Sequence, residues 1–233
     1  MIPTNIFHRV LHLAHGDVTA TGTLLHVDNR EYLATSKHFA ELLTDRVEIF
    51  YDNRWTLVAV SLVGHNPDAD VSVVALAAPI VYEELSINMT LAGMTYGGDV
   101  YFMGFPFGLS GTGSLLTRNF PIPFVKRAIV ANFASEEFGV DFWLDGHNNV
   151  GFSGGPIISV DPHNPTNCTL RGFVCSYYTH PEVIYGPSEA ERSTYQANSG
   201  LIMAAKVDRA LTMIAINPIG PVVQPPFAIY PIS

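Results

Sequence analysis

A glycine-rich turn holds the serine with the clearest chemical potential in this sequence. Ser153 lies within residues 151–156, which read Gly-Phe-Ser-Gly-Gly-Pro and precede a strand-favouring run. Glycines there allow two backbone N–H groups to point into one concavity beside a hydroxyl, the arrangement that binds the oxyanion of a tetrahedral intermediate. Because a hydroxyl is a weak nucleophile, this chemistry also requires a nearby base and a third group that orients the base.

A histidine and an aspartate at the ends of strand-like runs could supply those two groups. His38 follows a strand-favouring run that turns into a short helical segment, and Asp70 opens the run 71–76. Asp68 is the alternative carboxylate, but it lies in a turn-type cluster and is expected to be solvated. The chain order His38, Asp70, Ser153 is the order of base, orienting acid and nucleophile in chymotrypsin-type enzymes.

Short strands must position these side chains. Turn signals separate about a dozen β-favouring runs, and no helical segments of 10–15 residues lie between them, which disfavours parallel βαβ units. The runs are 6–13, 19–27, 31–35, 47–51, 55–63, 71–76, 100–105, 128–133, 140–143, 156–160, 169–178 and 200–204. Helix is expected only at 37–43 and at 206–214. The sequence therefore predicts an all-β protein, an antiparallel barrel or sandwich.

Composition excludes several classes of protein. Of the 233 residues 48% are hydrophobic and only 14% are charged, so the chain lacks the signature of disorder. A formal net charge of −9 disfavours nucleic acid and anionic membranes as partners. Two cysteines are too few for a disulfide framework, and no signal-type segment or apolar run of 18 residues is visible. We therefore expect a cytoplasmic protein.

Five motifs in order resemble the trypsin-like serine peptidases, in particular the HtrA/DegP-type members. They are an early strand at 21–25, the threonine-containing block ending in the histidine at 33–38, the aspartate strand at 70–74, a Gly-Phe-Pro-Phe-Gly loop at 104–108 and the serine loop at 151–156. The resemblance implies two six-stranded antiparallel β-barrels, the chymotrypsin/trypsin-like fold, with a short C-terminal helix and the active site between the barrels.

The resemblance also implies a role for each residue and a metal-independent reaction without cofactors. Ser153 would attack the scissile carbonyl of a protein or peptide substrate, His38 would take and return the proton, and Asp70 would hold the imidazole tautomer. The backbone N–H groups of Gly151 and Ser153 would form the oxyanion hole. The implied activity is that of a serine endopeptidase working through an acyl-enzyme intermediate.

The same resemblance places a substrate pocket between two stretches of chain. His147, six residues before Ser153, is similar in position to the base of the primary pocket, and Phe173, Val174 and Cys175 would stand on the opposite wall. We expect His147 to favour an acidic or polar side chain at the cleavage position. The alternative is an exposed loop histidine.

Two departures from the family pattern keep other functions open. Phe152 stands where the family usually has Asn or Asp, so pairing of that residue with a newly freed N-terminus is not expected. Lys37 precedes the histidine, and its ammonium could lower the pKa of His38. A catalytically impaired protease-fold module that captures extended peptides by strand addition is therefore the alternative function, and an esterase of the same fold is a third.

The expected organisation is an N-terminal barrel at 1–95, a C-terminal barrel with its helix at 96–216, and a proline-rich surface tail at 217–233. The glycine-rich stretch 93–98 is the candidate linker. A peptidase of this kind in a cytoplasm would need restriction by a narrow pocket, by a regulatory protein partner or by ordering of the segment 110–126.

Two groups of potential metal ligands carry no metal prediction. They are His8, His12 and His15, and the set His163, Cys168, Cys175 and His180. The three histidines would not share one face of a strand and are expected at the surface. The second set matches no strong zinc spacing, so buried thiols are expected instead.

Overall fold

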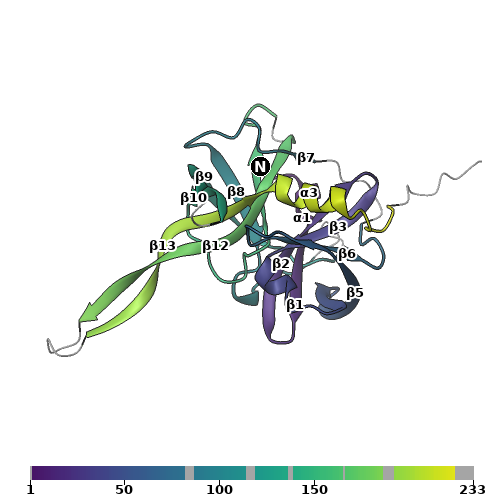
Figure 1. The fold of residues 1–233 in the computed structure, drawn as a ribbon, viewed down its shortest axis with the longest axis horizontal. Coiled ribbons are helices and arrows are strands. Elements are labelled where there is room, and N and C mark those ends of the chain that lie inside the picture. The colour runs from purple at the N-terminus through teal and green to yellow at the C-terminus, as the bar shows by residue number, and fades with distance from the viewer. Residues whose placement is uncertain are drawn as a thin grey trace, which may run out of the picture.

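The computed structural model describes residues 2–81, 87–113, 119–135, 139–164, 166–185 and 192–223. Its first six strands close into an antiparallel barrel in the order β1-β2-β3-β6-β5-β4 (Figure 1). They are β1 (Val10–His15), β2 (Val18–Val27), β3 (Arg30–Thr35), β4 (Arg46–Tyr51), β5 (Arg54–His65) and β6 (Ser72–Leu76). Asp28 and Asn29, and likewise Asp52 and Asn53, have positive φ, as two-residue hairpin turns between twisted strands require.

Six further strands close a second antiparallel barrel. The ring runs β8-β9-β10-β13-β12-β11, and the pairing of β11 with β8 completes it. The strands are β8 (Asp99–Gly104), β9 (Phe124–Ser135), β10 (Val140–Asp145), β11 (Pro156–Val160), β12 (Cys168–Tyr185) and β13 (Arg192–Lys206). A short strand β7 (Asn88–Met89) pairs in parallel with β12. The predicted all-β architecture of two six-stranded barrels is confirmed.

Helices within the described ranges are few and short. They are α1 (Thr4–Phe7), α2 (Lys37–Ala40), the 3₁₀ turn η1 (Pro106–Gly108) and α3 (Val207–Ile216). The predictions of helix after residue 36 and of a C-terminal helix are confirmed, although α2 ends earlier than expected. The expectation of strand from residue 6 is wrong at its start, because pairing of β1 with β2 begins only at Val10 and the chain before it forms α1.

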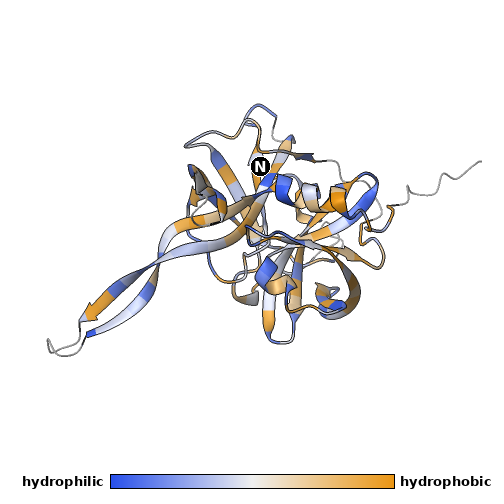
Figure 2. Cartoon of the chain, viewed as in Figure 1, coloured by the Kyte–Doolittle hydropathy of each residue, from blue (hydrophilic) through white to orange (hydrophobic). Residues whose placement is uncertain are grey.

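The core consists of three buried apolar clusters. One lies within the first barrel and one within the second. The third joins side chains of both barrels to helix α3, and includes Val73 from β6, Phe173 from β12 and Ile214 from α3. Helix α3 carries both apolar and polar residues (Figure 2). Val207, Ala210, Met213 and Ile214 are buried while Asp208 and Thr212 are exposed, as expected for a helix that packs on one face. This shared core fixes the barrels relative to each other.

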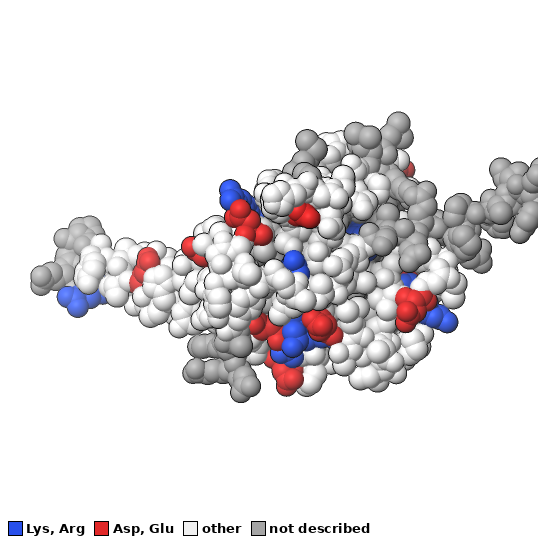
Figure 3. All heavy atoms as spheres, turned by 90° about the horizontal axis from the view of Figure 1, so that it is seen from above, with Lys and Arg blue, Asp and Glu red and all other residues white. Residues whose placement is uncertain are grey.

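A two-stranded ribbon projects from the second barrel (Figures 1 and 3). It forms because β12 pairs with β11 only as far as Phe173 and β13 pairs with β10 only from Leu201, whereas β12 and β13 pair with each other out to Tyr185 and Arg192. The sequence predicted strands at 169–178 and 200–204, so it located both strands but not their length.

The remaining predictions on organisation are tested only in part. Residues 220–223 lie against the β2–β3 hairpin, where the Glu31 N–H donates to the Pro221 carbonyl, while residues 224–233 lie outside the described residues. Residues 114–118 of the expected regulatory segment 110–126 also lie outside them. The division of the chain at 95 and 216 stays a prediction. No helix in the described part of the chain is both long and apolar enough to cross a membrane.

Candidate active site

His38 and Asp70 lie at the same end of two neighbouring strands. Strands β3 and β6 pair through Thr35 and Ser72, so the residues just after β3 and just before β6 come together. The Asp70 carboxylate accepts two hydrogen bonds from His38, one from Nδ1 at 2.8 Å and one from the backbone N–H at 2.9 Å. This geometry fixes the tautomer of the imidazole. Nδ1 carries the proton and donates it in a hydrogen bond to the carboxylate, and the lone pair of Nε2 points away from Asp70.

The hydrogen bond to Asp70 raises the pKa of His38 above its ordinary value, against the opposing effect of partial burial. The imidazole is well exposed, with 59% of its side-chain surface accessible. The suggestion that Lys37 lowers this pKa is wrong, because the pKa is raised and the groups that shift it are Asp70 and Glu41, against burial. His38 is therefore placed and tuned as a base that would be neutral above its raised pKa.

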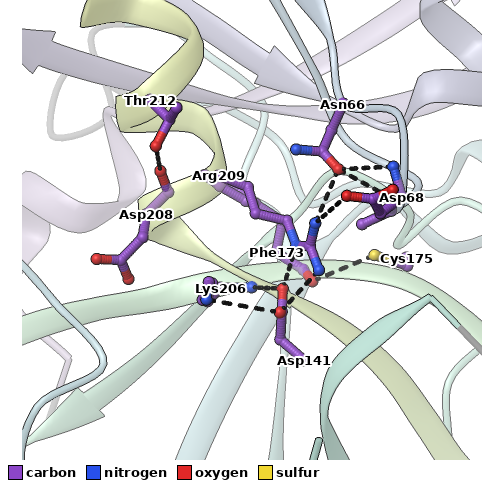
Figure 4. A network of polar contacts seen from close by, with 10 residues as sticks. Asn66, Asp68, Asp141, Phe173, Cys175, Lys206, Asp208, Arg209 and Thr212 are labelled. Carbon is purple, nitrogen blue, oxygen red and sulfur yellow. Dashed lines mark hydrogen bonds and ion pairs between the residues drawn. The ribbon is translucent and has the colours of Figure 1, made fainter. Parts of the chain in front are cut away.

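The turn that carries Asp70 is tied to the second barrel (Figure 4). The Asn66 side-chain oxygen accepts hydrogen bonds from the backbone N–H groups of Asp68 and Ala69, and a third from Arg209 at 2.9 Å. Arg209, on helix α3, also binds both carboxylate oxygens of Asp141 on β10. Asp68 is 73% exposed and lies 3.6 Å from the Arg209 guanidinium, as expected of a solvated turn residue rather than an imidazole partner.

The serine loop lies directly against the strand end that leads to His38. Gly154 has φ +84, and a Cβ at this position would stand 2.2 Å from the Thr21 carbonyl oxygen and 2.8 Å from the Ser36 backbone nitrogen. Only glycine fits so close to another backbone, which is why the turn needs its glycines. The loop of the second barrel is therefore docked on the first barrel beside α2.

Two serine hydroxyls take part in the site. The Ser153 hydroxyl donates to the Cys175 carbonyl at 3.0 Å, and Ser36 Oγ lies 3.3 Å from His38 Nε2. Since Nδ1 donates to Asp70, Nε2 accepts, so Ser36 is the donor. The structure thus joins His38 to Asp70 by a hydrogen bond, whereas the Ser153 hydroxyl is turned to β12.

Two backbone N–H groups of the serine loop have no partner in the described part of the chain. The N–H groups of Phe152, Gly154 and Gly155 donate to backbone carbonyls, and those of Gly151 and Ser153 do not. Gly151 has φ +102, a conformation open to glycine. Two unpaired donors on either side of one residue are what an oxyanion hole requires, and they belong to the two residues that the sequence singled out.

The predicted pocket residues lie in two different settings. His147 is exposed, and its carbonyl accepts a hydrogen bond from Lys126 at 2.7 Å. Phe173, Val174 and Cys175 are buried, and their side chains belong to the apolar clusters. This stretch of β12 therefore offers its main chain to the site, and the pocket assignment and the preference of His147 stay predictions.

Sequence reasoning missed three supporting groups, the side chains of Thr21, Ser36 and Arg209. Arg209 lies in a helix that was expected, but its contact with Asn66 spans 143 residues of sequence. Ser36 lies in the block 33–38 that ends in the histidine, and its hydroxyl two residues before His38 is a local signal. Thr21 lies in a motif that was recognised only as a strand.

The other candidate ligands do not form a site. His12 is buried rather than at the surface as expected: its ring stacks on Phe105 with centroids 4.4 Å apart, and burial lowers its pKa to about 4. Cys168 and Cys175 are both buried, as expected. Within the described residues, no three His, Cys, Asp or Glu side chains are grouped to hold a metal ion.

The two six-stranded barrels define the chymotrypsin-like fold. A histidine and an aspartate of the first barrel and a serine in a glycine-rich turn of the second lie at their junction. A serine-to-alanine variant of the HtrA-type protease AlgW with a tripeptide matches with a TM-score of 0.59 at 18% identity, and AlgW with a tripeptide matches with a TM-score of 0.57 at 20% identity. Each match covers 90% of this chain and 60% of the AlgW chain. The Rv3671c protease, in an inactive form, matches with a TM-score of 0.56 at 14% identity, over 91% of this chain and 90% of that one.

No protein-family model matches the sequence, and no curated protein matches it. At identities of 14–20% the structural likeness establishes the fold and leaves the activity to be argued from the site.

Proposed function

We propose that this protein is a serine endopeptidase that cleaves polypeptides through His38, Asp70 and Ser153. The observation that carries the proposal is the combination of a bonded imidazole–carboxylate pair with a serine flanked by unpaired backbone N–H groups. The two halves come from different barrels and meet where the Gly154 backbone lies against Ser36. A serine with only a structural role in the turn would need neither the imidazole–carboxylate pair nor the unpaired N–H groups.

The chemistry follows from the protonation states. Asp70 holds the Nδ1 proton of His38, so Nε2 can take the proton of Ser153 as the hydroxyl attacks the substrate carbonyl. The resulting imidazolium is stabilised by Asp70 and returns the proton to the leaving amine. Water, activated by the same imidazole, then releases the acyl group from Ser153.

The developing negative charge on the carbonyl oxygen would be bound by the N–H groups of Gly151 and Ser153. Each donor of this kind lowers the barrier by roughly 3–4 kcal/mol. Little free energy is needed to orient the two N–H groups during the reaction, because the loop is already held in place. Their electrostatic stabilisation of the oxyanion is largest where water is excluded.

Attack requires the Ser153 hydroxyl to leave the Cys175 carbonyl and turn toward His38. That change is a rotation about a single side-chain bond, between staggered rotamers. Hydrogen bonds of catalytic groups are often misaligned without substrate and form only in the substrate complex. The Cys175 carbonyl freed by this rotation could accept an N–H of an extended substrate by strand addition, so substrate binding and rotation would be linked.

The test is turnover of an unstructured protein and of a small peptide ester by the wild type, beside Ser153→Ala and His38→Ala. We expect both variants to lose about 10⁴-fold or more of the activity while keeping the wild-type melting temperature. Turnover of the ester but not of the protein would instead indicate an esterase. Mass spectrometry of the cleavage products also reports whether the residue before the cleaved bond is acidic or polar, as the His147 hypothesis requires.

The second candidate is a peptide-binding module without catalysis. It is favoured by one observation, that Ser153 bonds to β12 while Ser36 bonds to His38 Nε2. Such a module would bind extended peptides with the same affinity in the wild type and in Ser153→Ala, and neither would cleave them. Cleavage by the wild type that Ser153→Ala abolishes rejects this candidate.

A further inference from the structure

The carbonyl groups of the serine loop are all occupied, and this fixes the directions of its N–H groups. The Val150 carbonyl accepts from the Phe107 N–H, and the Phe152 carbonyl accepts from the Gly155 N–H. Because the C=O and N–H of one trans peptide point in opposite directions, these two bonds turn the N–H groups of Gly151 and Ser153 away from the loop. Between these two peptide planes lies a third, which joins Gly151 to Phe152.

That middle plane is held from the other barrel. The Thr21 hydroxyl, on β2, donates to the Gly151 carbonyl at 2.6 Å and accepts the Phe105 N–H at 3.1 Å. The backbone N–H of Thr21 donates to the Ser153 carbonyl at 3.1 Å. One residue of the first barrel therefore binds the serine loop at two points and the neighbouring loop of the second barrel at a third.

Thr21 is itself held firmly. Its side chain is fully buried, and its carbonyl accepts a hydrogen bond from the Thr35 hydroxyl at 2.9 Å. In a buried setting a hydrogen bond is stronger and an unpaired partner is costlier than in water. These contacts hold the Thr21 hydroxyl in one orientation, and the Gly151 carbonyl that accepts from it therefore points toward Thr21.

The side chain between the two unpaired N–H groups is apolar. The Phe152 ring is buried, with its centroid 5.0 Å from that of the Phe102 ring. Phe152 anchors the loop by packing, but an aromatic ring gives no direction to the peptide planes on either side of it. The direction must come from hydrogen bonds, and the middle plane has two: the Phe152 N–H donates to the Asn149 carbonyl at 3.3 Å, and the Gly151 carbonyl accepts the shorter bond from the Thr21 hydroxyl at 2.6 Å.

We propose that Thr21 is a positioning residue whose hydroxyl sets the Gly151–Phe152 peptide and thereby keeps the N–H groups of Gly151 and Ser153 aimed at the oxyanion. The proposal rests on the serine peptidase function proposed above. It adds that the first barrel controls the oxyanion hole of the second. Loss of the hydroxyl should damage the chemical step and leave substrate binding intact.

The experiment compares Thr21→Val, which keeps the shape and removes the hydroxyl, with Thr21→Ser, which keeps the hydroxyl. We expect Thr21→Val to lower kcat on a peptide ester about 10²-fold with KM unchanged, the loss that misplacement of catalytic groups by about 1 Å can cause. Thr21→Ser should restore kcat to within about threefold of the wild type, because it restores the same donor.

Thr23→Val is the matched control. The Thr23 hydroxyl, on the same strand, donates to the Gly154 carbonyl at 2.9 Å and is as deeply buried as that of Thr21. The peptide that it holds lies beyond Ser153 and next to neither unpaired N–H. Thr23→Val should lower the melting temperature as much as Thr21→Val and lower kcat less than about fivefold.

A second readout separates positioning from a general loss of structure. A peptide aldehyde binds as a tetrahedral adduct with an oxyanion, so Thr21→Val should weaken its inhibition about 10²-fold. The same peptide without the aldehyde should bind Ser153→Ala and the Thr21→Val/Ser153→Ala double variant equally. Equal binding in the face of weaker inhibition would support a role confined to the oxyanion hole.

Three results would overturn the inference: a wild-type kcat in Thr21→Val, a Thr21→Ser variant as impaired as Thr21→Val, or an equal loss of kcat in Thr23→Val. Each of these requires an active wild type, so the proposed function would survive them. A wild type that neither turns over the ester nor binds the aldehyde would remove the proposed function, and this inference with it.

Discussion

The two barrels contribute unlike halves to the candidate site. The imidazole and carboxylate belong to the first barrel and are joined by two hydrogen bonds at the end of the paired strands β3 and β6. The serine loop belongs to the second barrel, yet three of its carbonyls are held by Thr21 and Thr23 of the first. The hydrogen bonds that join the imidazole to the carboxylate lie within one barrel, and the second barrel reaches them only through Arg209 and the turn before Asp70. The oxyanion half, in contrast, depends directly on contact between the two barrels.

Substitutions in the two halves should therefore impair different steps. A change in the imidazole–carboxylate pair should impair proton transfer and leave the oxyanion hole intact. A change at the contact between the barrels should impair the oxyanion hole and leave proton transfer intact. The two kinds of damage can be told apart by kinetics even when the total loss of activity is similar.

The largest effect that separates the halves is expected for Asp70→Asn. An amide cannot hold the Nδ1 proton as the carboxylate does, so Nε2 would no longer be the free base, and kcat should fall about 10⁴-fold. Inhibition by a peptide aldehyde should weaken far less than kcat. Asp68→Asn is the control and should keep wild-type turnover, because Asp68 is exposed and does not contact His38; equal losses in both variants would contradict the assignment.

The pH dependence of the wild type gives the next largest effect. Attack needs neutral His38, and Asp70 raises the pKa of this group, so kcat/KM should fall as the pH drops through a value above the ordinary histidine pKa. Below that value the loss should approach tenfold per pH unit. Thr21→Val should lower the kcat/KM reached at high pH and leave the pH of the acid-side fall unchanged. A shift of that fall in Thr21→Val would show that the oxyanion half and the acid–base half are not independent.

Arg209→Gln tests how much the contact with the second barrel stabilises the turn that carries Asp70. Arg209 links Asp141 of the second barrel to Asn66, which shapes the turn before Asp70. Loss of these charged hydrogen bonds should lower the free energy of unfolding by roughly 1.5–3 kcal/mol, measured by denaturant titration. Arg127→Gln, which removes an exposed pair with Asp99, should leave stability unchanged.

Ser36→Ala is expected to have the smallest effect. It removes the hydroxyl that donates to His38 Nε2 and competes with Ser153 for that nitrogen. We expect kcat/KM on a peptide ester to stay within about threefold of the wild type or to rise. A collapse of activity comparable to that of Ser153→Ala would mean that Ser36, and not Ser153, is the reacting hydroxyl.

The sequence predicted the parts of the site that depend on local pattern. Runs of β-favouring residues separated by turn signals indicated the strands of both barrels, and the chain order together with the resemblance to trypsin-like peptidases paired His38 with Asp70. Cross-barrel contacts carry no local pattern, so neither Arg209 with Asn66 nor Thr21 with Gly151 could be predicted. The β12–β13 ribbon escaped prediction because strands without a core to cover need no alternation of apolar residues, and the Ser153 rotamer depends on packing that only the folded chain defines.

The proposed mechanism requires His38 to activate the Ser153 hydroxyl. Labelling with a fluorophosphonate, followed by mass spectrometry of the modified peptide, tests this in the wild type, Ser36→Ala and His38→Ala. We expect a single adduct on Ser153 in the wild type, the same adduct in Ser36→Ala, and at least a 10³-fold slower reaction in His38→Ala. An adduct on Ser36, or an unlabelled wild type, would show that Ser153 is not a nucleophile activated by His38.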